Sequence, residues 1–109
     1  MYLKPVEALN DQFRTTFDVN LGEVVIVGDL AKEPPELVHL VKEAVKAFDE
    51  FNENNDPYLE HDFGCFELAG SSYIWKIDYY NHSRSGYSPD PSDPVKTHRV
   101  LSILYAYDY

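Results

Sequence analysis

The stretch NDPYLEHDFG, residues 55–64, concentrates side chains that can transfer protons or bind metal ions. Carboxylates and imidazoles act as general acids and bases and as ligands of divalent cations. Residues from elsewhere in the chain could join them through the fold. The resulting alternative hypothesis is a metal-assisted or acid–base hydrolase that uses Glu60, His61, Asp62, Asp78 and His98.

The local spacing argues against that hydrolase. Catalytic zinc sites contain recognisable pairs, such as two histidines one helical turn apart, and the sequence contains no such pair. If residues 60–62 are extended, adjacent side chains point to opposite faces, so Glu60, His61 and Asp62 cannot all converge. A structural role is favoured for His61 and Asp62, which can satisfy backbone N–H groups beside the turn. We therefore predict no catalytic residue, no metal site and no cofactor.

The first half of the chain predicts two helices around one strand. Pro5 suits a first helical position, and apolar residues follow it at helical spacing, which predicts a helix over residues 5–17. The β-branched run EVVIVG predicts a well-buried strand over residues 23–28. Two prolines, early acids and a long apolar stripe predict a helix over residues 34–52. The stripe consists of Leu37, Leu40, Val41, Ala44, Val45, Phe48 and Phe51.

The second half predicts a hairpin and a closing strand. Residues 62–68 and 73–80 form the arms of the hairpin around an AGSS turn, with Cys65 as a buried small hydrophobe. A long proline-rich loop follows over residues 81–94. Residues 97–109 predict a central strand, because both faces of the segment are apolar. The sum is one α+β domain over residues 1–109, with two helices packed on a mostly antiparallel sheet of about four strands.

The balance of charge is the most unusual property of the chain. Nineteen acidic residues stand against nine basic ones, the formal net charge is −10, and no Lys or Arg lies between Lys46 and Lys76. A surface of this sign repels nucleic-acid phosphates and anionic lipids and favours basic protein partners. We therefore expect neither direct nucleic-acid binding nor a membrane anchor. The single cysteine and the absence of a leader or a membrane-spanning apolar run predict a cytoplasmic location.

Aromatic residues give a second signal. Phe, Trp and Tyr make up 15% of the chain, and nine of them are Tyr. Tyr is enriched at protein interfaces because its large amphipathic ring loses little entropy when it is fixed. We expect Tyr73 and Tyr105 in the core, and Tyr80, Tyr87 and Tyr109 in contact with solvent.

Five segments match a known pattern together: LNDQFR, NDPYLEHDFG, WKIDYYN, SPDPSDP and THRVLSILYAYDY. In this order they resemble a small bacterial family of unknown function, number 3768 in the domain-of-unknown-function series. The resemblance implies no activity and assigns no site residues. It implies a context, because members are similar to proteins found among plasmid, phage and other mobile-element cargo.

Charge, aromatic content and this context together favour a small acidic inhibitory protein. Its carboxylates would occlude a cationic, nucleic-acid-binding surface of a partner protein by standing in for phosphates. The resemblance makes a counter-defence inhibitor of the anti-CRISPR or anti-restriction kind the concrete form of this hypothesis. A housekeeping or regulatory interaction module is a third possibility, and the target and the oligomeric state stay open.

The predicted contact residues lie on the exposed side of the second helix and on the turn after it. Helical geometry brings Glu43 and Glu50 close to Lys46, whereas Asp49 and Glu53, one turn apart, are less compensated. The full set is Glu43, Asp49, Glu50, Glu53, Asp56 and Glu60.

Overall fold

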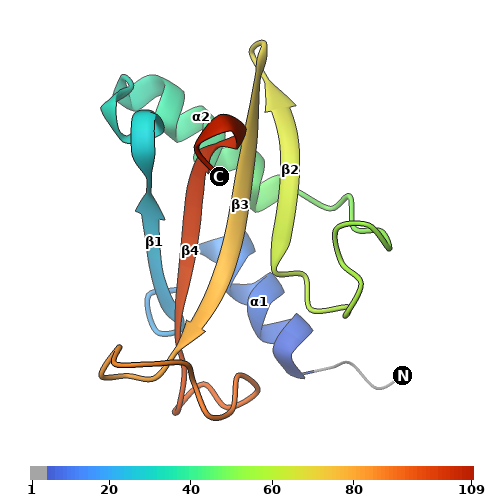
Figure 1. Cartoon of the computed structure of the whole chain (residues 1–109), viewed down its shortest axis with the longest axis vertical. Coiled ribbons are helices and arrows are strands. Elements are labelled where there is room, and N and C mark those ends of the chain that lie inside the picture. Colours follow the sequence, from blue (N-terminus) through green and yellow to red (C-terminus); the bar gives the residue numbers. More distant parts are fainter. Residues whose placement is uncertain (1–4) are drawn as a thin grey trace.

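The computed structural model describes residues 5–109. Within that range two α-helices cover one face of a four-stranded sheet (Figure 1). The helices are α1 (Pro5–Thr16) and α2 (Pro35–Ala47), and the strands are β1 (Gly22–Ile26), β2 (Phe63–Leu68), β3 (Ser71–Tyr80) and β4 (His98–Tyr105). Two 3-10 turns, η1 (Gly28–Lys32) and η2 (Ala106–Asp108), complete the fold. The predicted α+β architecture is confirmed.

The sheet has the order β1-β4-β3-β2, so β4 lies inside it, as predicted. β4 pairs antiparallel with β3 and parallel with β1, and β2 pairs antiparallel with β3. The prediction of a well-buried strand over residues 23–28 is wrong, because β1 is an edge strand with mostly half-buried side chains. It ends at Ile26 because Gly28 takes a left-handed conformation (φ 65°) and starts η1.

The core lies between the sheet and the two helices. Alternate residues of β3 and β4 point toward the helices, as the two-residue period of a strand requires. Tyr73 and Tyr105, which were predicted to be internal, are 1% and 7% exposed. The buried apolar residues are Phe13, Leu21, Leu30, Val41, Val45, Phe48, Tyr73, Trp75, Ile77, Leu101, Ile103 and Tyr105.

Helix α2 ends at Ala47 rather than at residue 52. Phe48 is already extended (φ −61°, ψ 130°), and the chain there leaves the helix axis. Phe48 and Phe51 pack edge-on against Trp75, with ring centroids 5.5 and 6.1 Å from it. Such aromatic contacts in the core outweigh the helical preference of a short apolar segment. The apolar stripe therefore continues in the sequence after the helix has ended.

The β2–β3 hairpin is confirmed, with a tighter turn than predicted. Ala69 and Gly70 have φ angles of 52° and 83°, as in a two-residue turn of type I′. Gly64 faces Trp75, and a Cβ at this glycine would lie 2.3 Å from the indole Nε1. The next residue, Cys65, therefore points to the opposite face and is exposed, so its predicted burial is wrong.

Candidate functional site

The segment that connects α2 to β2 folds back over α1 and carries most of the predicted site residues. Asp56 organises it: the Oδ1 atom accepts hydrogen bonds from the backbone N–H groups of Glu60 and His61, both at 2.9 Å. The side chain of Asp56 is 2% exposed. Asp56 thus takes the backbone-capping role predicted for His61, whereas the carboxylate of Asp62 bonds the backbone N–H of its own residue, in line with its prediction. The prediction that Asp56 is a surface contact is wrong, because its carboxylate is inside the protein.

Two residues of this segment have strained backbones. Leu59 and His61 adopt left-handed conformations, with φ angles of 55° and 54°. Each such conformation costs a non-glycine residue about 1 kcal/mol or more, and neighbouring contacts must hold it in place. The hydrogen bonds that the carboxylate of Asp56 accepts from Glu60 and His61, and its carbonyl oxygen from Leu59, supply that hold.

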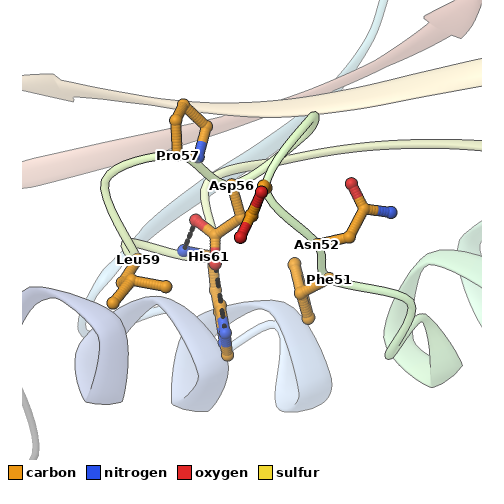
Figure 2. A pocket seen from close by; sticks show the side chains of 7 residues that line it. Phe51, Asn52, Asp56, Pro57, Leu59 and His61 are labelled. Carbon is orange, nitrogen blue, oxygen red and sulfur yellow. Dashed lines mark hydrogen bonds and ion pairs between the residues drawn. The ribbon is translucent and has the colours of Figure 1, made fainter.

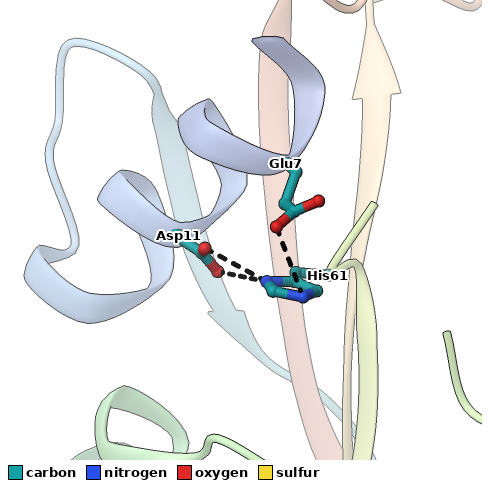
Figure 3. Close-up of side chains that lie close together, drawn as sticks. All are labelled: Glu7, Asp11 and His61. Carbon is teal, nitrogen blue, oxygen red and sulfur yellow. Dashed lines mark hydrogen bonds and ion pairs between the residues drawn. The ribbon is translucent and has the colours of Figure 1, made fainter. Parts of the chain in front are cut away.

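His61 lies among three carboxylates, two of which come from α1 (Figure 3). Its Nδ1 atom is 2.8 Å from Oδ1 of Asp11, and its Nε2 atom is 3.7 Å from Oε1 of Glu7 and 3.3 Å from Oδ2 of Asp56. One face of the imidazole stacks on Phe51, with centroids 3.8 Å apart. We name Glu7, Asp11, Asp56 and His61 the histidine cluster.

Sequence reasoning missed Glu7 and Asp11. The two acids are four residues apart on α1 and so lie on the same side of the helix. That spacing was the available signal, but the partner histidine is fifty residues further along the chain. Only the tertiary fold brings the helix and the loop together.

The histidine cluster accounts for its own geometry without a metal ion. Glu7, Asp11 and His61 each offer one ligand atom, and these atoms lie within 4.8 Å of one another. However, Nδ1 of His61 is already at hydrogen-bond distance from Asp11. An imidazole that shares a proton with a carboxylate satisfies both groups.

A pocket of about 600 Å³ opens beside the cluster (Figure 2). Its lining combines apolar surface from the loop with carboxylates and the imidazole. Oδ2 of Asp56 is buried and accepts no hydrogen bond from any residue in the range 5–109, and Nε2 of His61 lies 3.3 Å from it. The lining residues are Phe51, Asn52, Glu53, Asp56, Pro57, Leu59 and His61.

The structure does not assemble the hydrolase constellation. Asp78 pairs with Lys76 on the same strand, and Nε2 of His98 is 2.9 Å from Oε1 of Glu23. The side chains of Glu60 and Asp62 are hydrogen-bonded to each other. Burial raises the pKa of Asp62, and the nearby carboxylates of Asp56 and Asp78 raise it further. His61, Asp78 and His98 therefore each have different partners.

Of the other predicted contact residues, Glu60 is half-buried and four are on the surface. Glu43, Asp49, Glu50 and Glu53 are exposed, and we call them the acidic rim. Glu43 pairs with Lys46 at 3.4 Å, as predicted, whereas the other three form no ion pair with any residue in the range 5–109. Their predicted helical spacing is wrong for Asp49, Glu50 and Glu53, because these follow the end of α2.

Two arginines are inside the protein and contribute little to the surface. Arg14 donates to the carbonyl oxygens of Val45 and Lys46, at 2.9 and 3.2 Å, and so caps the C-terminal end of α2. Arg99 is fully buried and donates to Oδ1 of Asn10 at 2.7 Å and to the carbonyl oxygen of Pro91 at 2.6 Å. Burial lowers the pKa of both guanidinium groups.

Comparison with known proteins identifies a family to which the chain is similar. The sequence profile of a family described as "Protein of unknown function (DUF3768)" matches residues 25–108, which include every residue that lines the pocket. The chain matches no curated protein and no solved structure. Neither helix within residues 5–109 has the length and apolar character needed to cross a bilayer.

Proposed function

Because the chain belongs to the DUF3768 family, whose function is unknown, we propose a function from the surface of the chain itself. The acidic rim binds a cationic surface of a partner protein and excludes nucleic acid from it. The observation that carries this proposal is the exposure of Asp49, Glu50 and Glu53 without an ion-pair partner among the described residues.

The distribution of positive charge supports the proposal. Nine basic residues are few against nineteen acidic ones, and two of them, Arg14 and Arg99, are buried. Lys76 and Lys46 are engaged by Asp78 and Glu43. Exposed loop carboxylates that form no ion pair within residues 5–109 attract a cationic surface over a distance set by the Debye length, about 8 Å at physiological salt. The rim therefore favours a protein partner of opposite sign.

The rim also fits competition with nucleic acid. A protein surface that binds phosphates presents Lys and Arg side chains in rows, and carboxylates can occupy the same positions. Electrostatic attraction speeds association, and aromatic or apolar contacts slow release. Tyr58, which is 78% exposed next to the rim, is suited to such a contact.

The narrower form of the proposal is a counter-defence inhibitor, in which the partner is a nuclease of a CRISPR or restriction system. It draws on the mobile-element context that the family resemblance implies. The same experiment addresses both forms, because the identity of the captured protein separates them.

The test is affinity capture followed by competition. The immobilised protein is exposed to bacterial lysate at about 0.05 M and about 0.5 M salt, and each captured protein is identified and purified. Its binding to nucleic acid is then measured with and without the acidic protein. We expect capture of nucleic-acid-binding proteins at low salt only, release by added DNA, and inhibition of their nucleic-acid binding.

Two double variants with equal charge change locate the surface. Asp49→Asn with Glu50→Gln neutralises part of the rim and should weaken inhibition about tenfold or more. Glu23→Gln with Glu36→Gln changes the charge equally at exposed positions outside the rim and should leave inhibition within about twofold. Equal loss in the two variants, or capture that persists in high salt and with DNA, would falsify the proposed function.

A further inference from the structure

We propose that the pocket beside the histidine cluster receives an arginine side chain of the partner protein. This inference rests on the proposed function and names the contact that gives it specificity. The pocket lies directly after the acidic rim in the chain, and Glu53 belongs to both. A partner drawn to the rim therefore presents its cationic side chains at the mouth of the pocket.

The charge around the pocket favours a cation. The carboxylates of Glu7, Asp11 and Asp56 surround His61, and Glu53 adds a fourth at the pocket lining. Among the described residues two cationic groups oppose them: His61 when it is protonated, and Arg14, which is 3.4 Å from Asp11. Negative charge is in excess even in that state. A desolvated carboxylate also acts over a longer range than an exposed one, because the medium around it is less polarisable.

The unsatisfied oxygen of Asp56 is an independent sign of a ligand. Buried carboxylate oxygens are normally hydrogen-bonded, and one without a partner costs about 1–3 kcal/mol or more. Within residues 5–109, Oδ2 of Asp56 accepts no hydrogen bond and has only the ion-pair contact of 3.3 Å with His61, on a side chain that is 2% exposed and lines the pocket. A cation in the pocket offsets this cost. The cation stabilises the carboxylate of Asp56 by electrostatic attraction without direct contact. It forms its direct ion pair with Glu53, which is exposed in the pocket lining.

The other lining residues select a guanidinium rather than an ammonium group. Phe51, Pro57 and Leu59 provide apolar surface. Leu59 is 55% exposed, so its apolar side chain is accessible to a ligand. A guanidinium is planar and weakly hydrated, so it loses less than an ammonium on contact with apolar and aromatic walls. The volume of about 600 Å³ is ample for one arginine side chain.

The first experiment uses a small ligand instead of a partner. The ¹⁵N-labelled protein is titrated with N-acetyl-arginine-N′-methylamide at pH 7, and the backbone amide shifts are followed by NMR. We expect saturable changes confined to residues 51–61, with a Kd on the order of 1 mM. The lysine analogue should bind about threefold more weakly or worse. No saturation by about 50 mM arginine ligand, changes centred elsewhere, or an equal response to lysine overturns the proposal.

Two substitutions test residues of the pocket, and a third outside it is the control. Asp56→Asn keeps the Oδ1 acceptor for the two backbone N–H groups and removes the charge, and should weaken arginine binding about fivefold or more. Glu53→Gln should weaken it about two- to threefold. Glu36→Gln, an exposed acid at the start of α2 and outside the pocket, should leave it unchanged. If Asp56→Asn does not fold by circular dichroism, Glu53→Gln against Glu36→Gln decides the question.

A zinc titration provides the competing outcome. If Zn²⁺ shifts the same resonances and blocks arginine, the histidine cluster is a metal site and the arginine pocket is wrong. Failure of this proposal can be told apart from failure of the proposed function. Arginine binding without any inhibited partner supports the pocket alone, whereas partner inhibition without arginine binding supports the rim alone.

Discussion

The acids up to and within the turn at residues 52–55 differ in environment from those after it. Asp49, Glu50 and Glu53 are exposed, whereas Asp56 is buried and the side chain of Asp62 is hydrogen-bonded to that of Glu60. In the sequence all of them belong to one acidic stretch without a basic residue. The difference shows that a run of acidic residues in the sequence does not by itself form an acidic surface. The turn divides it into an exposed part, which we propose contacts a partner, and a part that folds against α1.

The turn closes on itself through asparagine side chains. Oδ1 of Asn52 accepts from the backbone N–H groups of Asn54 and Asn55, at 2.8 and 3.2 Å, and Nδ2 of Asn55 donates to the carbonyl oxygen of Glu50 at 2.8 Å. Local bonds of this kind compete with continuation of a helix. They reverse the chain within a few residues and direct the segment after Asp56 toward α1.

The largest effect is expected from Asp56→Ala. It leaves the backbone N–H groups of Glu60 and His61 without their acceptor and removes a carboxylate beside His61. We expect the free energy of unfolding to fall by about 3 kcal/mol, since each unpaired buried polar group costs about 1–3 kcal/mol. Urea denaturation followed by circular dichroism measures it.

The matched change on the other side of the turn is Asp49→Ala. Asp49 is exposed and should shift stability by no more than about 0.5 kcal/mol. The Asp56→Asn variant should lose less stability than the Asp56→Ala variant, because the Oδ1 acceptor remains. Comparable losses for Asp49→Ala and Asp56→Ala would contradict the division of the two regions.

The next largest effect concerns the place where α2 ends. Arg14→Met keeps an unbranched apolar side chain but removes the guanidinium group that donates to Val45 and Lys46. Stability should fall by about 2 kcal/mol, because two carbonyl oxygens lose a charged donor. Differential scanning calorimetry measures the loss, and Lys32→Met, at an exposed ion pair, is the control with about 0.5 kcal/mol or less. A loss no larger than that of the control would show that Arg14 does not fix the helix end.

The smallest expected effect is an increase in the free energy of unfolding. The pKa of Asp62 is raised in the folded protein, chiefly by burial, so its ionised form opposes folding at neutral pH. Asp62→Asn should stabilise the protein at pH 7 by at most about 0.5 kcal/mol, since the group is partly solvated. The gain should disappear as the pH falls below about 4, where Asp62 is protonated in both states. Thermal melts of both proteins from pH 3 to 7 test this, and a gain that grows on acidification contradicts it.

Much of the fold could be predicted because it depends on short-range patterns. The helical spacing around Phe13, the alternation around Trp75 and the apolar faces of the segment around Ile103 each determine an element and its buried side. The end of α2 could not be predicted, because Phe48 and Phe51 fit a helical stripe equally well. Their contacts with Trp75, a residue of strand β3, determine where α2 ends.

Less of the candidate site could be predicted. His61 was identified by its residue type, but Glu7 and Asp11 approach it from α1 through contacts that no local pattern records. The role of Asp56 was also misassigned, since an Asp before Pro57 reads as an exposed turn residue. Its burial follows from the path of the whole loop, which in turn depends on where α2 stops.

The place of β4 in the sheet has a consequence for how the molecule is made. β4 joins β1 to the β2–β3 hairpin, and it is the last strand in chain order. During synthesis on the ribosome, the emerging hairpin has nothing to extend it and β1 has no neighbour, and a lone hairpin is barely stable in water. The domain therefore completes its sheet only after residues 98–105 have been released, and the pairing of Gly22 with Arg99 then closes a long stretch of chain.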